Sequence, residues 1–249
     1  MMRILLMTAT INPRKGEPLL KRTDPDSRRK DYEKAFLFYL DFLGKGIDHI
    51  LFVENSEADL MDFKDLIPDE LQEKVELISF YGLDYPIEHG RGFGEFKLID
   101  YAMQNSTIVK KLNDTDYILK ITGRYQMINF GKILKYFPEN FDLFCNHRNY
   151  PVSWADMFFI AWNKKFYFSF FDGIFNKFKM DENGVAPEVS LREYLSEIGQ
   201  KIKLVPRYNV IPKLEAAKAM NNQSYQGFAN KSKYIFRSAL NRLLPWLWI

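Results

Sequence analysis

The chain has 249 residues, 47% of them hydrophobic and 27% charged, which is enough for one large α/β domain with a sizeable core. Its net charge of +3 excludes the strongly basic balance that is typical of nucleic-acid-binding proteins, so no nucleic-acid partner is expected. The single cysteine, Cys145, excludes an intramolecular disulfide and a cysteine-based zinc site; it indicates a reducing cytoplasm, with the thiol buried as a small apolar group.

Apolar runs alternate with amphipathic patterns along the first half of the chain. Each apolar run predicts a buried strand and each amphipathic segment a helix. The expected elements, in chain order, are a strand at 3–10, a basic loop at 14–30, a helix at 31–43, a strand at 49–55, a short helix at 58–68, a strand at 75–80, and a glycine-rich turn feeding a helix that begins near Glu95.

The second half continues the alternation as far as residue 212. Its expected elements are a strand that begins the segment 116–129, a strand at 141–149, a strand with an aromatic helix at 156–171, a helix at 186–199 with Gly199 as C-cap, and a late strand at 201–212. This pattern predicts an α/β fold with a mostly parallel sheet and helices on both faces. We expect one domain over 1–230 and a separate C-terminal tail over 231–249.

The tail, KSKYIFRSALNRLLPWLWI, combines basic and large apolar residues. It contains Lys231, Lys233, Arg237 and Arg242, no acidic residue, and two tryptophans near its end. Such a composition is typical of a helix that lies on anionic lipid. The alternative is a terminal helix that docks on its own domain or on a partner subunit. Because no signal peptide and no run of roughly 20 apolar residues is apparent, we expect peripheral attachment at the inner face of the cytoplasmic membrane.

Several common chemistries have no matching motif. The sequence has no G-x-S-x-G turn and no G-x-x-x-x-G-K-[ST] phosphate loop, and none of His49, His89 and His147 stands in a metal-ligand spacing. The sequence GRGFGE at 90–95 resembles the dinucleotide fingerprint only loosely, because it has glycines at 90, 92 and 94 and lacks the third glycine at the required position. This segment is either a close approach to a phosphate at a helix start or a plain flexible turn.

Asp114 and Asp116 form an Asp-x-Asp pair, the metal motif of many sugar-nucleotide transferases. A metal-binding pair must follow its strand and face the nucleotide cleft, whereas these aspartates precede theirs. The segment Asn-Asp-Thr-Asp therefore predicts a turn. We assign no metal ligand, and a divalent metal is not favoured as a cofactor.

The other end of the same strand, KITGRY, carries residues suited to phosphate binding. Gly123 permits close backbone approach, Arg124 offers a planar fork for a phosphate, and Tyr125 can stack or donate a hydrogen bond. Lys120 lies in an otherwise apolar strand, so it needs an anionic partner, which is either a structural carboxylate or a ligand.

The chain resembles a family of bacterial glycosyltransferases encoded among lipopolysaccharide O-antigen and capsule biosynthesis genes. The resemblance is carried in order by RILLMTATINP, KRTDPDSRRKDYEKA, ILFVENS, GRGFGEFKLIDYAM, DYILKITGRYQMIN and ADMFFI. It covers roughly residues 2–200 and is most specific over 120–125 together with Asn129. It implies a GT-A-like, Rossmann-like nucleotide-diphosphosugar fold that transfers a sugar from an activated donor to a lipid-linked glycan. The chain departs from ordinary GT-A enzymes in lacking Asp-x-Asp after the strand.

The expected donor site lies over the ends of the first and fourth strands. We expect the base and ribose near Thr8, Ala9 and Thr10, with the diphosphate neutralised electrostatically in place of a metal. The residues expected to hold the diphosphate and the sugars are Arg124 with Gly123 and Tyr125, assisted by Arg22, Arg28 or Lys120.

Three carboxylates are candidates for activating the acceptor hydroxyl. Glu188, in PEVSLREYL, is similar to the E-D-x-x-L segment of many GT-A enzymes, with Val189 in place of the second acid. A helix N-terminus ordinarily lowers a carboxylate pKa, and ordinary charge placement there is the alternative reading. Asp156 is the rival base beside Trp154, a candidate platform for the acceptor sugar, and Glu95 is a third residue expected near the acceptor.

Two other functions are compatible with the sequence. A sugar nucleotidyltransferase is expected to carry a glycine-rich loop with a Lys/Arg pair after its first strand, and TATINPRKGEP is a poor version of that loop. A non-catalytic assembly protein would use the aromatic surface and the basic tail. A transferase implies a nucleotide-sugar donor and a glycan acceptor as its partners.

Overall fold

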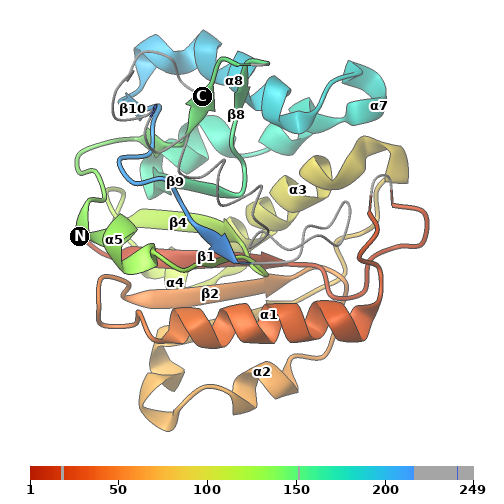
Figure 1. Ribbon diagram of the computed structural model, residues 1–249, viewed down its shortest axis with the longest axis vertical. Helices are drawn as coiled ribbons and strands as arrows, with labels where there is room; N and C mark the ends of the chain where they lie inside the picture. The colour runs from red at the N-terminus through yellow and green to blue at the C-terminus, as the bar shows by residue number, and fades with distance from the viewer. Residues whose placement is uncertain (18–19, 151, 216–239, 241–249) are drawn as a thin grey trace.

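The computed structural model describes residues 1–17, 20–150, 152–215 and Leu240 (Figure 1). The predicted tail at 231–249 therefore lies outside the described residues, apart from Leu240. Among the residues described, no helix has the length and apolar character needed to cross a bilayer.

The longer elements alternate between strand and helix along the chain, as the sequence pattern predicts. They are β1 (Arg3–Ala9), α1 (Pro25–Leu40), β2 (His49–Glu54), α2 (Met61–Asp65), β3 (Val75–Ser79), α3 (Gly90–Asn105), α4 (Thr107–Lys111), β4 (Tyr117–Thr122), α5 (Phe130–Lys135), β9 (Phe159–Asn163) and α8 (Pro187–Ile198).

Shorter elements connect or extend these. The two-residue strands are β5 (Gln126–Met127), β6 (Leu143–Phe144), β7 (His147–Arg148), β8 (Trp154–Ala155), β10 (Leu204–Val205) and β11 (Leu214–Glu215). The short helices are α6 (Lys164–Phe166) and α7 (Met180–Asn183), a π-helical turn at Tyr167–Phe171, and 3-10 turns at Asp69–Lys74, Ile87–His89, Ile174–Phe178 and Gly199–Lys201.

Seven strands form the central sheet, in the order β10-β6-β9-β4-β1-β2-β3. β1 pairs in parallel with both β2 and β4, and only β9 runs antiparallel to its neighbours in this sheet. The prediction of a mostly parallel α/β sheet is therefore confirmed.

Helices cover both faces of the sheet, because alternate residues of each strand point in opposite directions. Leu5 and Met7 of β1 pack in one core with α1 and α5, whereas Ile4 and Leu6 pack in a second core with α3 and α8. Figure 1 shows α1 on one side of the sheet and α3 on the other. Strands buried on both faces read as continuous apolar runs, which is why the sequence predicts them well.

Helix α1 begins at Pro25, six residues before the start that the apolar pattern predicts. Asp24 caps it by accepting a hydrogen bond from the Ser27 backbone N–H at 2.8 Å, and Pro25 occupies the first turn. Both are favourable signals for a helix start. The first half of α1 is mostly polar, so apolar periodicity alone misses it.

Helix α3 begins at Gly90, so the prediction of a start near Glu95 is wrong. The glycines of this segment are explained by packing: a Cβ on Gly92 would overlap the ring of Pro187, and one on Gly94 would overlap the Tyr85 hydroxyl. The segment is consequently a closely packed first turn and not a flexible turn.

The third quarter of the chain also differs from the prediction. The expected strand at 141–149 is divided, because β6 pairs with β9 and β10 whereas β7 pairs with β8. Asp156 does not open a strand; it lies between β8 and β9. The late strand is limited to β10, and Pro206 follows it immediately, where it cannot donate to a strand ladder. Cys145 is fully buried, as predicted.

Candidate active site at the carboxyl ends of β1 and β4

The strand order reverses between β1 and β4, because the chain runs from β1 outward through β2 and β3 and then returns to the other side of β1. Open α/β sheets bind ligands outside the carboxyl ends of the strands at such a reversal. The ends of β1 and β4 are joined directly, since the Gly123 N–H donates to the Thr8 carbonyl at 2.9 Å. The sheet topology therefore brings Thr8 to Thr10 and Lys120 to Tyr125 to the position where a ligand is expected.

Lys120 is fully buried and makes two short polar contacts. Its ammonium lies 2.6 Å from the Glu95 carboxylate and donates to the Met157 carbonyl at 2.6 Å. Burial lowers its pKa, and the nearby charges of Glu95 and Glu188 act in the opposite direction. Of the two partners predicted for Lys120, the structure shows the structural carboxylate, which is Glu95 of α3.

Glu95 is engaged by three donors from two strands. Besides the Lys120 ammonium, it accepts hydrogen bonds from the hydroxyls of Thr8 at 2.8 Å and Thr122 at 3.3 Å. All three contacts are made to one carboxylate oxygen, Oε1, and they tie α3 to the ends of β1 and β4.

Asp156 reaches the same edge of the sheet because β9 is antiparallel. The residues that precede β9 lie beside the carboxyl end of β4. The buried Asp156 carboxylate pairs with Arg148 at 2.8 Å and accepts from the Asn146 side-chain amide at 2.9 Å. The guanidinium of Arg148 also lies 5.2 Å from the ring centre of the half-buried Trp154. Asp156 and Trp154 are therefore joined through one cation.

Glu188 is the second residue of α8 and is half-buried. Burial raises its pKa, the charges of Glu95 and Asp156 raise it further, and Arg91 lowers it. The lowering expected from the helix N-terminus is therefore outweighed. Within residues 1–17, 20–150 and 152–215, no ion pair joins Glu188 to a basic side chain, in contrast to Glu95 and Asp156. Of the three candidates, Glu188 is the carboxylate best suited to accept a proton.

Arg124 and Tyr125 follow β4 directly. The buried Arg124 guanidinium lies 4.8 Å from the Tyr125 ring centre and donates to the Tyr125 hydroxyl at 3.2 Å. A Cβ on Gly123 would lie 2.7 Å from the Thr8 carbonyl oxygen, so glycine is needed for the two strand ends to approach each other. The close backbone approach predicted at Gly123 is made to β1.

Arg22 and Arg28 both bind protein groups around the loop that follows β1. Arg28 is buried and donates to the Thr10 carbonyl at 2.8 Å, while Arg22 pairs with Asp31, with one contact at 2.9 Å. The Thr10 hydroxyl donates to Asn55 at 2.6 Å. These two cations therefore shape the loop that carries Thr10.

Three polar residues of this region are not among the candidates predicted from sequence. Thr122 stands inside the KITGRY motif, and its place at the strand end is the signal that could have indicated it. Asn146 and Arg148 give no local signal, since the two-residue strand β7, which contains Arg148 and directly follows Asn146, positions them beside Asp156.

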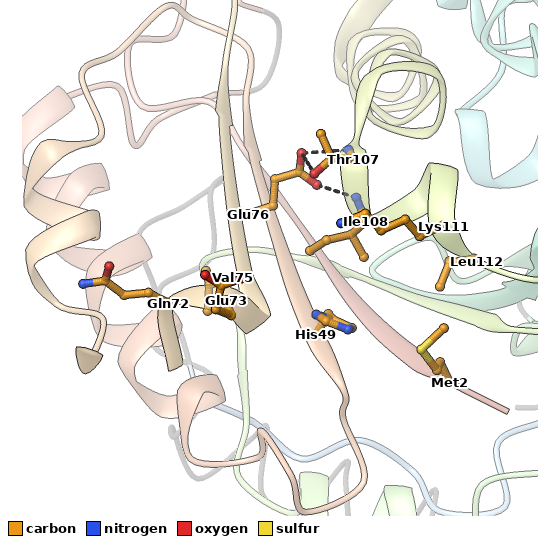
Figure 2. Close-up of a pocket in the computed structure, with 10 residues that line it drawn as sticks. All are labelled: Met2, His49, Gln72, Glu73, Val75, Glu76, Thr107, Ile108, Lys111 and Leu112. Atoms are coloured by element: carbon orange, nitrogen blue, oxygen red, sulfur yellow. Dashed lines mark hydrogen bonds between the residues drawn. The ribbon is translucent and has the colours of Figure 1, made fainter. Parts of the chain in front are cut away.

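The opposite edge of the sheet holds a cavity of about 370 Å³ (Figure 2). Met2, His49 and Val75 line it at the amino ends of β1, β2 and β3. The Glu76 carboxylate points from β3 to α4, where it accepts from the backbone N–H groups of Thr107 and Ile108 at 2.8 and 3.0 Å. No residue predicted to bind substrate lines this cavity.

The Asp-x-Asp pair also lies at this amino edge. The buried Asp116 carboxylate accepts from the backbone N–H groups of Met2 at 2.7 Å and Asn113 at 2.8 Å, and a turn at 114–115 precedes β4. The predicted turn is therefore confirmed. In the part of the chain that the structure describes, no group of three His, Cys, Asp or Glu side chains is arranged to hold a metal ion.

Neither a protein-family model nor a curated protein matches this sequence. Among solved structures, the chain is similar to a protein of Desulfovibrio desulfuricans G20 that is provisionally described as a nucleotide-diphospho-sugar transferase (14% identity, 96% of each chain covered, TM-score 0.49). It is also similar to a 4-diphosphocytidyl-2C-methyl-D-erythritol synthase (9% identity, 96% of this chain and 99% of the other, TM-score 0.42). A cytidylyltransferase of Leptospira borgpetersenii gives 11% identity over 98% of this chain and 89% of the other, with a TM-score of 0.39.

Proposed function

We propose that the protein is a transferase that moves a sugar from a nucleotide-sugar donor to a hydroxyl of a glycan acceptor. The observation that carries this proposal is the convergence of Glu188, the Lys120–Glu95 pair and the threonine hydroxyls where the strand order reverses. A half-buried carboxylate with a raised pKa, close to the expected ligand position, is the group that a proton transfer from an alcohol requires.

The donor would lie across the ends of β1 and β4. Its base and ribose would contact Thr8, Ala9 and Thr10, and its diphosphate would lie beside Arg124 and Tyr125. A guanidinium is always charged and binds phosphate oxygens in a bidentate manner. Arg124 therefore supplies electrostatic stabilisation to the leaving nucleoside diphosphate without a bound metal.

In the transfer step, Glu188 takes the proton of the acceptor hydroxyl. The acceptor oxygen forms a bond to the anomeric carbon, and the bond from that carbon to the phosphate oxygen breaks, so that the nucleoside diphosphate leaves with the electron pair. Trp154, supported by Arg148, would hold the acceptor sugar. The resemblance described above supports a lipid-linked glycan as the acceptor, of the kind used for O-antigen or capsule.

The loop after β1 supports a second candidate, a sugar nucleotidyltransferase. Lys15 is exposed and precedes Gly16, whose φ is +83°, as expected of a loop that wraps a phosphate. Arg14, however, is bound to Glu17 at 2.8 Å and to the Leu83 carbonyl at 3.0 Å. Of the Lys/Arg pair expected in a nucleotidyltransferase loop, Lys15 is then the residue available to bind a triphosphate. We therefore prefer glycosyl transfer to nucleotidyl transfer as the function.

The proposal predicts that Glu188→Gln abolishes catalysis but not donor binding. Purified protein would be screened by thermal shift with UDP-, GDP-, CMP- and dTDP-sugars, and the stabilising donor would then be used in a transfer assay with glycan acceptors. We expect Glu188→Gln to lower kcat by about 10²- to 10⁴-fold, since it removes a general base. Glu193→Gln, on the exposed face of the same helix, is the matched control and should behave as wild type.

Two arms of this assay separate the alternatives. Transfer that persists in EDTA is expected if Arg124 neutralises the diphosphate, whereas complete loss restored by Mn²⁺ would contradict that assignment. Release of pyrophosphate from a nucleoside triphosphate and a sugar phosphate would identify a nucleotidyltransferase. A protein that no nucleotide sugar or nucleotide stabilises would be a binding or assembly protein instead.

A further inference from the structure

The Lys120–Glu95 pair joins a fully buried ammonium to a half-buried carboxylate, and the charge of Glu95 acts on the neighbouring Glu188. We propose that this pair is a positioning unit: it fixes the charge that Glu188 faces and so keeps Glu188 ready to accept a proton at neutral pH. This inference rests on the proposed function, because it assigns Glu188 a proton to accept.

The packing of α3 against α8 brings Glu95 close to Glu188. Gly92 is in such close contact with Pro187 that no Cβ fits between them. Glu95 lies three residues beyond Gly92 and therefore on the same face of α3, while Glu188 directly follows Pro187. The two carboxylates consequently belong to the same helix contact, with the Lys120 ammonium 2.6 Å from Glu95.

Residues from α3, β4, β1 and the segment before β9 hold the pair in place, so its two charges keep a fixed position relative to Glu188. Glu95 comes from α3 and Lys120 from β4, the Thr8 hydroxyl of β1 donates to Glu95 at 2.8 Å, and the Met157 carbonyl accepts from Lys120 at 2.6 Å. A fixed ion pair presents a constant field, in contrast to a mobile surface pair that solvent screens.

The charged groups that face Glu188 have opposing effects. Arg91 and Glu95 come from α3, Lys120 from β4, and Asp156 from the segment before β9; Arg192 lies one turn further along α8. Asp156 is paired with Arg148, and its charge still raises the pKa of Glu188. Without Lys120, the negative charge of Glu95 would act on Glu188 uncompensated and would keep Glu188 protonated to higher pH. Without Glu95, the ammonium would act alone and hold Glu188 ionised to lower pH.

The test is a pair of substitutions with opposite expected shifts. Lys120→Met should move the low-pH limb of the kcat/KM profile upward by about one pH unit, and Glu95→Gln should move it downward by about the same amount. The double variant should return towards the wild-type profile. Lys97→Gln, which removes a surface cation of α3, is the control and should leave the profile unchanged. A purely structural pair would lower the melting temperature and leave the pH profile where it is.

A measurement without substrate separates this inference from the proposed function. The titration of the Glu188 side-chain carboxyl would be followed by ¹³C NMR of the full chain, with its signal assigned by its loss in Glu188→Gln. The pKa of Glu188 measured in this way should be higher in Lys120→Met and lower in Glu95→Gln than in wild type, as expected for the kcat/KM profile. If Lys120→Met does not fold, Glu95→Gln and the double variant still give the two required titrations. Identical Glu188 titrations in all folded variants would overturn the inference, whereas shifted titrations without any transfer activity would instead contradict the proposed function.

Discussion

At the residue scale, Asp100 shows how burial changes the pKa of a carboxylate that lies outside the candidate site. It lies in the middle of α3, where it accepts hydrogen bonds from the Tyr167 hydroxyl and from the Gly173 backbone N–H at 2.8 Å. Burial raises its pKa to about 6. Because this folded-state value is above the ordinary one, the folded protein binds the proton more tightly than the unfolded chain does. The stabilisation from this proton is complete below about pH 4 and is lost as the pH rises through about 6.

Asp100→Asn should therefore remove a pH dependence of stability. An amide keeps an acceptor oxygen for Gly173 but does not titrate in this range. We expect the free energy of unfolding of wild type, relative to the variant, to fall by up to about 3 kcal/mol between pH 4 and pH 7. Urea unfolding across that range measures it, with Asp65→Asn on the exposed end of α2 as the control. Parallel curves for wild type and Asp100→Asn would show that Asp100 does not titrate there.

The three carboxylates of the candidate site differ in their partners more than in their sequence context. Glu95 is paired with Lys120 and Asp156 with Arg148, and only Glu188 combines partial burial with a raised pKa. The sequence correctly indicates that Lys120 needs an anionic partner. It could not identify Glu95, because the partner is chosen by the packing of α3 on the sheet and not by any local pattern.

At the element scale, the contact between α3 and α8 depends on a glycine. Gly92→Ala forces a methyl group against the rigid ring of Pro187, so we expect destabilisation by about 1–3 kcal/mol. Gly199→Ala is a matched control, because Gly199 has a helical φ of −57° and no atom lies within 4 Å of the added Cβ. That change should be neutral or stabilise by about 0.4–1 kcal/mol. Thermal unfolding of both variants measures the difference, and equal stabilities would mean that α3 and α8 are not in close contact.

The same contact explains why the start of α3 is difficult to predict. Alternating glycines within six residues ordinarily indicate a turn, since glycine is unfavourable inside a helix. Here the space is taken by Pro187 and Tyr85, which lie elsewhere in the sequence. Tertiary packing, which a local pattern does not record, decides that this segment is helical.

At the scale of the whole molecule, the long buried strands and the alternation of elements were predictable, because sheet burial on both faces leaves a strong apolar signal. The strand-end position of the candidate site followed from the same pattern. The division of the predicted strand at 141–149 into β6 and β7, and the strand β8, were not predictable, since pairing partners and not composition define them. The grouping of Asp156, Arg148 and Asn146 depends on those short strands.

Attachment to a membrane is also a property of the whole chain, and we propose that the basic tail at 231–249 provides it. Deleting 231–249 should release the protein from vesicles that contain anionic lipid, because four basic residues and two tryptophans are lost. Co-sedimentation of full-length and truncated protein with anionic and with neutral vesicles measures this. Equal sedimentation of the two forms would assign the attachment, if any, to another surface.

The buried ammonium of Lys120 bears on whether parts of the chain can fold separately. Its acceptors, Glu95 and Met157, stand 25 positions before it and 37 after it. A fragment that ends before Met157 would contain the parallel strands β1, β2, β3, β4 and β6 and most of their helices, yet it would leave the ammonium with only one of its two acceptors. The cost of burying a charge that is incompletely paired then opposes closure of the sheet in either fragment. We therefore expect the N-terminal strands and the antiparallel β9, which pairs with β4, to unfold as one cooperative unit.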